Sequence, residues 1–353
     1  MSLQRIRIIG SGLIGTSIGL AAVARGLQVE MVDSDPRSQS IAQNLVQSKA
    51  LEAPAQLVLI AVPISAFTEV MEREFALNLE ASFIDVLSVK VKPVIEAEAL
   101  KIPLQRYLPT HPMAGREIGG AESARADLFI DRPWIIDPAG VDSKTLELGQ
   151  ELIALCGAII YQLPIAEHDR AVALISHLPQ ITASLLASQL LASQGQWLEL
   201  AGGGLRDTTR IAASDANLWR EIITSNSAAL KPLLISMRDQ INTLIGNLDN
   251  LKAVENFLIL GNKGRSLIPG KHGGVARNYT YLPVIIEDKP GQLAALFDEC
   301  DLAGVNVEDI SIEHSPGQFT GLVMLALSNS DAILLQQHLN DKGWTVHSPR
   351  GEK

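Results

Sequence analysis

The segment Thr-His-Pro-Met-Ala-Gly, at residues 110–115, holds the side chain best suited to acid–base chemistry. The imidazole of His111 titrates near neutral pH, so it can act as a general base, although most histidines in folded chains are only packed or solvated. A second polar stretch, Ser88-Val89-Lys90, also follows a predicted strand. Parallel strands end at a common edge of a sheet, so Ser88 and His111 are expected to meet in one crevice.

A glycine-rich turn predicts that this crevice holds a dinucleotide. Gly10, Gly12 and Gly15 form a GxGxxG pattern that ends a predicted strand at residues 5–9 and opens a helix. Gly10 would permit the tight turn, Gly12 would let backbone amides reach a pyrophosphate, and Gly15 would let helix and strand pack closely.

Asp33 follows the second predicted strand, at residues 28–32, where an acidic residue can bind ribose hydroxyls. A carboxylate there would repel a 2′-phosphate, so the sequence predicts NAD rather than NADP. The alternative is that Asp33 is only a turn residue. The predicted cofactor-binding residues are Gly10, Gly12, Leu13, Ile14, Gly15, Asp33, Val62 and Pro63.

Strands alternate with helices through residues 1–163, which predicts an α/β domain of the Rossmann type with a parallel, doubly wound sheet. Ligands of such sheets bind at the carboxyl ends of the strands, where Val62, Ser88 and His111 lie. Two further strands, at residues 134–137 and 158–163, are expected to extend the sheet at its edge. The other expected strands cover residues 5–9, 28–32, 57–61, 82–86 and 106–108.

From residue 164 to residue 261 the apolar period changes to 3.6, which predicts an all-α domain. Its helices are apolar enough to bury two faces, and one of these could be a subunit interface. A homodimer is therefore expected. The predicted helical runs include residues 197–200, 216–227 and 231–248.

The last part of the chain reads as a separate module. Residues 262–278 are basic and rich in glycine, and they are expected to form a solvated linker, with a basic patch for an anion as the alternative. Residues 279–353 show the order strand, helix, strand, strand, helix, strand. This pattern predicts a small α+β domain.

Composition excludes several classes of protein. A net charge of −10 over 353 residues, with no basic stripe, argues against nucleic acid. Nothing resembles a signal peptide, and polar residues interrupt the apolar run at residues 171–191, so a cytoplasmic protein that spans no membrane is expected. Cys156 and Cys300 lack paired spacing, which favours buried structural thiols and no metal site.

Four motifs in order resemble the prephenate and arogenate dehydrogenases of tyrosine biosynthesis. They are Asp-Val-Leu-Ser-Val-Lys at 85–90, the segment at 110–115, Ser-His-Leu-Pro at 176–179 and Thr-Arg-Ile-Ala at 209–212, with Trp219 beyond. The resemblance implies an oxidative decarboxylation, in which NAD takes a hydride from C4 of a cyclohexadienol, CO2 leaves and an aromatic ring forms. It also implies that His111 accepts the hydroxyl proton and that Ser88 hydrogen-bonds in the same site, while Lys90 has either a structural role or a direct contact.

The resemblance further implies that Arg210 binds a substrate carboxylate and that Trp219 forms a wall of the same pocket. Gly202-Gly203-Gly204 is expected to allow close backbone approach near Arg210. Arg116 is a second candidate for the anion, since a small-molecule substrate with two carboxylates needs guanidinium groups.

Two residues of the Ser-His-Leu-Pro helix concern the substrate side chain. His177 is a pocket candidate by resemblance, and the alternative is a satisfied core histidine. Gln180 replaces the histidine that many family members carry there. Because arogenate carries an ammonium that a carboxylate would favour, the neutral amide of Gln180 predicts prephenate as the substrate. Arogenate dehydrogenase is the alternative.

The C-terminal pattern resembles an ACT domain, on the turn Asp-Lys-Pro-Gly-Gln-Leu at 288–293 and Gly-Val-Asn-Val at 304–307. That resemblance implies an aromatic amino-acid effector, tyrosine above all, and the alternative is a pairing module without a ligand. Two other functions compete with the dehydrogenase. A β-hydroxyacid or imine reductase would not account for Ser88 with His111, and a sensor of NAD and amino acids would need no acid–base group.

Overall fold

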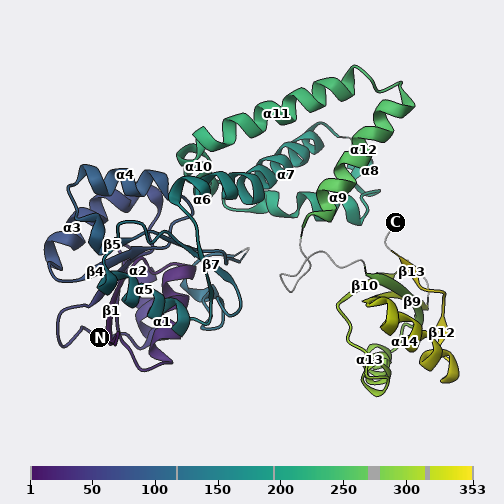
Figure 1. Cartoon of the computed structure of the whole chain (residues 1–353), viewed down its shortest axis with the longest axis horizontal. Helices are drawn as coiled ribbons and strands as arrows, with labels where there is room; N and C mark the ends of the chain where they lie inside the picture. Colours follow the sequence, from purple (N-terminus) through teal and green to yellow (C-terminus); the bar gives the residue numbers. More distant parts are fainter. Residues whose placement is uncertain (1, 117, 194, 269–278, 315–318, 352–353) are drawn as a thin grey trace. The chain divides into compact units, whose positions relative to one another are not determined.

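The computed structural model describes residues 2–116, 118–193, 195–268, 279–314 and 319–351 (Figure 1). Its contacts divide the chain into two compact units, Met1–Ile241 and Asn242–Lys353. The first unit joins the predicted nucleotide-binding domain to most of the predicted helical domain.

The first unit contains the predicted parallel sheet, with strand order β2-β1-β3-β4-β5. All four neighbouring pairs run parallel, which confirms the doubly wound α/β fold. The strands are β1 (Arg5–Ile9), β2 (Gln28–Val32), β3 (Leu57–Ile60), β4 (Ser82–Asp85) and β5 (Tyr107–Leu108).

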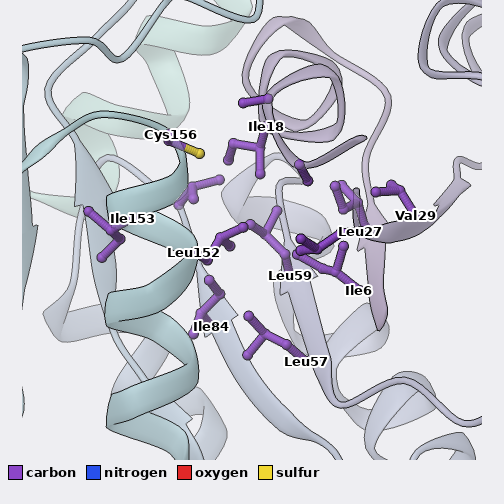
Figure 2. Close-up of a cluster of buried hydrophobic side chains, with 14 of the residues drawn as sticks. Ile6, Ile18, Leu27, Val29, Leu57, Leu59, Ile84, Leu152, Ile153 and Cys156 are labelled. Carbon is purple, nitrogen blue, oxygen red and sulfur yellow. The ribbon is translucent and has the colours of Figure 1, made fainter. Parts of the chain in front are cut away.

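Helices cover both faces of this sheet (Figure 1). Alternate residues of one strand face opposite sides, so Leu57 and Leu59 join one buried cluster and Val58 joins the other. Figure 2 shows the first cluster, in which strand residues pack against Ile18 and Leu152. The helices are α1 (Leu13–Val23), α2 (Pro36–Val46), α3 (Phe67–Leu77), α4 (Val91–Ala99) and α5 (Ser143–Leu155).

The prediction that residues 134–137 and 158–163 extend this sheet is wrong. They form β7 (Pro133–Ile136) and β8 (Ile159–Gln162), which build a separate three-stranded sheet with β6 (Thr110–Pro112). Pro109 separates β5 from β6 and has no N–H for a ladder, so the parallel pairing ends there. β6 then pairs antiparallel with β7. His111 therefore lies on the first strand of this second sheet.

The helical part begins with α6 (Ile165–Val172), a π-helical turn at Ala173–His177 and α7 (Leu178–Gln189). Pro179 explains the wide turn, because it has no N–H to donate and its ring crowds the carbonyl four residues earlier. The stretch Ile165–Ala192 is long and apolar enough to cross a membrane by length and composition alone. Near its start, the buried side chain of Asp169 accepts hydrogen bonds from the backbone amides of Lys90 and Val91.

Further helices complete the first unit: α8 (Gly195–Leu198), α9 (Gly203–Thr209), α10 (Ala216–Ser225) and α11 (Ser227–Ile245), whose last turn enters the second unit. α10 packs on the sheet domain, since Ile222 is buried in the same cluster as Phe67 and Val89. Glu221 of α10 also accepts a hydrogen bond from the Ser65 hydroxyl at 2.8 Å.

The second unit contains α12 (Leu251–Ser266), which extends into the predicted linker. A linker beginning at residue 262 is therefore wrong for residues 262–266, and residues 269–278 lie outside the described part of the chain. The basic side chains Lys263 and Arg265 instead occupy the last turn of α12, where positive charge interacts favourably with the helix dipole.

The βαββαβ order predicted for the C-terminal module is confirmed. Its sheet has strand order β10-β11-β9-β12, with β13 also pairing with β9, and its neighbouring strands run antiparallel. Leu282, Leu325 and Leu335 lie in one buried cluster between sheet and helices. The elements are β9 (Thr280–Glu287), α13 (Gln292–Leu302), β10 (Asp309–His314), β11 (Thr320–Leu327), α14 (Asn329–Asp341), β12 (Thr345–Val346) and β13 (Arg350–Gly351).

Candidate active site

The glycine-rich turn has the shape that a bound pyrophosphate needs. Gly10 adopts a φ of +109°, and a Cβ atom on it would collide with the carbonyl oxygen of Ala61. A Cβ atom on Gly15 would collide with the carbonyl oxygen of Gly10, so only glycine lets helix α1 approach the turn. Gly12, the N-cap of α1, faces open space within 4 Å, which leaves the backbone amides at the start of the helix accessible. Leu13 and Ile14 form its first turn.

Asp33 braces this turn from the end of β2. Its Oδ2 atom accepts a hydrogen bond from the amide of Ser11 at 2.5 Å, and its Oδ1 atom accepts one from the amide of Asp35 at 2.9 Å. The hydroxyl oxygens of Ser11 and Thr16 are buried and have no hydrogen-bond partner within the part of the chain that the structure describes. Val62 and Pro63 follow β3 beside the same turn, and the Val62 amide lies next to Gly10.

His111 is joined to a second histidine that the sequence analysis did not select. Its Nδ1 atom lies 2.9 Å from Nε2 of His168, and the two rings meet edge to face with centroids 5.1 Å apart. Nδ1 of His168 in turn lies 2.8 Å from Oδ1 of Asp169. His168 is completely buried and Asp169 nearly so. Three polar side chains thus form one line from α6 to the candidate base.

The turn after β4 carries Ser88 and is tied to the strand of His111 through Lys90. The Lys90 ammonium is buried, pairs with the carboxylate of Asp85, and donates to the carbonyl oxygen of Thr110 at 2.5 Å. Asp85 also accepts from the hydroxyl of Tyr107 at 2.6 Å. These contacts give Lys90 a structural role. Ser88 lies half-buried in this turn.

The surroundings of His111 keep its imidazole neutral. Burial lowers its pKa well below the usual value, and the nearby His168, Lys90 and His177 lower that pKa further. Burial also lowers the pKa of Lys90, although the carboxylate of Asp85 opposes this shift. A neutral imidazole near pH 7 has a free electron pair, which a general base requires.

His177 lies on the π-helical turn and faces α10. Its Nδ1 atom lies 3.1 Å from Nδ2 of Asn226, which also donates to the backbone oxygen of Asp169 at 2.7 Å. The Trp219 ring meets the His177 ring edge to face at 6.0 Å. Burial lowers the pKa of His177 to about 4, against the opposing charge of Asp169. His177 thus has the contacts of a neutral, buried histidine.

The remaining predicted residues occupy three different settings. Gln180 is buried on α7, with Nε2 3.5 Å from the hydroxyl of Ser184. Arg210 is exposed at the start of the short 3₁₀ helix Arg210–Ala213. Arg116 is also exposed, and it donates to the carbonyl oxygen of Ser123 in its own loop at 2.9 Å.

The close backbone approach expected at residues 202–204 does not occur within the described chain. A Cβ atom added to any of these three glycines would meet nothing within 4 Å. Gly202 instead serves as the N-cap of α9, and Gly203 and Gly204 form its first turn.

Sequence reasoning missed His168, Asp169 and Asn226. A signal for the first was present, since His168 lies four residues before Val172 and so shares the apolar face of a helix. A histidine beside an aspartate on a buried face needs partners for its ring nitrogens. Asn226 had no such signal, because it follows the end of α10 and its partners come from other helices.

Models of one protein family match most of the chain. Residues 10–162 match the nucleotide-binding domain of prephenate dehydrogenase, and residues 164–259 match the dimerization domain of the same family. A probable prephenate dehydrogenase from Streptomyces niveus, NovF, is 32% identical and covers 97% of this chain and 99% of its own length.

Two solved structures each resemble about three quarters of the chain. The prephenate dehydrogenase of Aquifex aeolicus, in complex with hydroxyphenyl propionate and NAD+, is 25% identical with a TM-score of 0.67, over 76% of this chain and 99% of that one. The arogenate dehydrogenase of Synechocystis is 26% identical with a TM-score of 0.62, over 75% of this chain and 100% of that one. This chain, which has a glycine-rich turn suited to a nucleotide and a neutral His111 just after the last strand of the parallel sheet, belongs to the prephenate dehydrogenase family.

Proposed function

We propose that this protein is an NAD-dependent prephenate dehydrogenase, which converts prephenate to 4-hydroxyphenylpyruvate and CO2 in tyrosine biosynthesis. The observation that carries the proposal is the half-buried His111, whose lowered pKa keeps it neutral, just beyond the carboxyl end of β5 in a sheet whose first strand leads into a dinucleotide turn. The family supports the reaction, since its matched models span residues 10–162 and 164–259.

The residues around the glycine turn fit NAD. Gly10 and Gly15 permit the tight turn, and the open space at Gly12 leaves room for a pyrophosphate at the start of α1. Among the described residues, the buried hydroxyls of Ser11 and Thr16 have no hydrogen-bond partner. Asp33 already holds the turn through Ser11, and its carboxylate would disfavour a 2′-phosphate at the adenosine ribose. When bound, NAD supplies the acceptor for the hydride that leaves C4 of the substrate ring.

His111 would serve as the base. As the C–H bond at C4 breaks, its Nε2 atom would take up the hydroxyl proton of the ring, so that a ketone rather than a protonated ketone forms. The bond between the ring and its carboxylate then breaks, so that CO2 leaves and the ring becomes aromatic. His111 returns its proton to the phenolate oxygen. No proton is gained or lost overall. Ser88 would orient the substrate hydroxyl toward His111.

Arg210 is proposed to pair with a substrate carboxylate, because a guanidinium can bind both of its oxygens. His177 and Trp219, which pack edge to face, would form a wall of the pocket, and buried Gln180 would face the keto-acid side chain. Arg116, whose guanidinium donates to its own loop, is the second candidate for the anion.

A cytoplasmic homodimer, formed through the helical part, belongs to the same proposal. The family's own description of the segment matching residues 164–259 supports it, as do large apolar side chains left exposed there, among them Leu185, Trp197 and Ile241. The C-terminal βαββαβ module is proposed to be an ACT-like domain that binds an aromatic amino acid.

The test is formation of reduced nicotinamide by the purified protein, with prephenate and arogenate each paired with NAD and with NADP. Turnover with prephenate and NAD is expected, and failure of both substrates would overturn the function. Replacement of His111 by Asn should lower kcat by roughly two to four orders of magnitude and spare NAD binding. His347→Asn, which alters an exposed histidine, is the matched control and should leave kcat unchanged.

A further inference from the structure

Asp169 is the fixed end of the line that leads to His111. It accepts hydrogen bonds from the backbone amides of Lys90 at 2.8 Å and Val91 at 2.9 Å, and both of these groups can only donate. Its third contact is Nδ1 of His168, at 2.8 Å. Although burial opposes ionisation, the hydrogen bonds from His168 and the two amides lower the pKa of Asp169. Asp169 is therefore a carboxylate that accepts from all three.

An acceptor at this end sets the direction of every bond in the line. Because Asp169 accepts, Nδ1 of His168 carries a proton. In neutral His168 the Nε2 atom then has only an electron pair, so it must accept from its neighbour. That neighbour is Nδ1 of His111, 2.9 Å away. The proton of neutral His111 consequently lies on Nδ1, and its Nε2 atom is left with a free electron pair.

We propose that His168 and Asp169 are positioning residues that hold His111 in the tautomer whose Nε2 atom can accept the substrate proton. The proposal rests on the proposed function, since it concerns the base of that reaction. In the opposite tautomer Nε2 of His111 would carry a proton, and the ring could not accept another from the substrate. The same line would stabilise the imidazolium that forms during the reaction, because Asp169 supplies a negative charge at its far end.

The other charged or titratable groups around His111 do not determine which of its ring nitrogens carries the proton. Lys90 points its ammonium at Asp85 and the backbone of Thr110, which orders the strand rather than the ring. His177 accepts at Nδ1 from Asn226, so its own proton lies on Nε2. The Asn226 orientation is fixed independently, because the same Nδ2 atom donates to a carbonyl oxygen.

Two substitutions of His168 separate the tautomer from packing. His168→Leu removes both bonds and fills similar space, and it should lower kcat by about 10²- to 10⁴-fold while NAD affinity stays within about twofold. His168→Gln keeps a donor for Asp169 and an acceptor for His111. Its kcat should therefore stay close to the wild-type value. Wild-type kcat in a folded His168→Leu protein, or equal loss in both variants, would overturn the proposal.

A control isolates the cost of losing a buried hydrogen bond. Thr145→Val removes the buried 2.8 Å contact with Ser82, which lies at the opposite end of β4 from Ser88. Its melting temperature should fall as in His168→Leu, yet its kcat should stay at the wild-type value.

The tautomer can also be read without any substrate. In protein labelled with 15N at histidine, His111 should show a protonated Nδ1 signal and an unprotonated Nε2 signal near pH 7, and the assignment follows from loss of both signals in His111→Asn. His168→Leu should give a mixture of the two tautomers. A protonated Nε2 in the wild-type protein would overturn the proposal whatever the substrate proves to be. Lack of turnover with prephenate would instead overturn the function and leave this result standing.

Discussion

The Lys90 ammonium donates to the carbonyl oxygen of Thr110, one residue before His111, over 2.5 Å. It also pairs with Asp85, and the backbone amide of Lys90 donates to Asp169. A single buried residue thus joins the turn that holds Ser88, the strand that holds His111, and helix α6. The geometry of the site depends on a buried ion pair that does not itself need to touch the substrate.

Removal of the Lys90 ammonium should therefore destabilise the protein. Lys90→Met leaves Asp85 buried without its cation, which typically costs about 3–5 kcal/mol. The free energy of unfolding, measured with urea, should fall by that amount. The double variant Lys90→Met with Asp85→Asn removes the uncompensated charge and should recover part of the loss. No recovery in the double variant would show that the two side chains do not act as a pair.

The free energy of unfolding should decrease as the pH is lowered from about 6.5 to 4, because His177 is neutral in the folded protein. Burial lowers its pKa to about 4, whereas an unfolded histidine titrates near 6.5. The stabilising difference is thus complete above about pH 6.5 and is lost as the unfolded state gains a proton, at up to about 1.4 kcal/mol per pH unit. His111, whose pKa is also lowered, adds to the same slope.

Thermal unfolding in buffers across that range checks this prediction. His177→Gln should flatten the slope by the contribution of one proton. Replacing exposed His347 by Gln should leave the slope unchanged, which makes it the matched control. An unaltered slope in His177→Gln would mean that His177 is not neutral in the folded protein.

Asp33 should decide between the two nicotinamide cofactors. Asp33→Ser removes the charge that disfavours a 2′-phosphate, and a hydrogen bond to a charged group contributes about 1.5–3 kcal/mol. The ratio of kcat/KM for NAD over NADP should therefore fall by roughly 10- to 100-fold. Asp35→Ser is the control, since Asp35 caps α2 through the amides of Arg37 and Ser38. Equal ratios in the two variants would remove Asp33 from the ribose site.

Gln180 should influence the choice between prephenate and arogenate. It is buried on α7, three residues after His177, and a carboxylate there would attract the ammonium of arogenate. Gln180→Glu should raise kcat/KM for arogenate relative to prephenate, measured by reduced nicotinamide formation. Gln189→Glu, an exposed change on the same helix, should leave that ratio alone. An unchanged ratio in Gln180→Glu would count against contact with the substrate side chain.

The sequence predicted the parts of the fold that depend on local pattern. The strand and helix around Gly10, the parallel strands and the βαββαβ module follow from glycine spacing and from periods of 2 and 3.6. The second sheet was not predictable in this way. Whether a strand such as β7 pairs with β6 or extends the main sheet depends on a partner distant in sequence, and Pro109 alone does not fix that choice.

The site shows the same division. His111 was predicted from its motif, yet the residues that set its protonation come from α6, more than fifty positions later. Lys90 was left open between two roles because burial decides between them, and burial is a property of the packed molecule. The exposed settings of Arg210 and Arg116 likewise depend on how loops and short helices turn, which composition does not encode.

The C-terminal module should bind tyrosine at the turn before α13, where an ACT-like domain would hold an amino acid. Titration calorimetry of the full chain with tyrosine, phenylalanine and tryptophan tests this, and no heat from any of them would leave a pairing module without a ligand.

Gly291, at the N-cap of α13, has a φ of +89°, and Gly343 has a φ of +81°. Replacing either glycine by Ala should lower the free energy of unfolding by about 1–2 kcal/mol, which is the cost of a left-handed backbone conformation for a residue with a Cβ atom. Because the two glycines have similar positive φ values, only Gly291→Ala should weaken tyrosine binding, and equal effects of the two changes on that binding would place the ligand elsewhere.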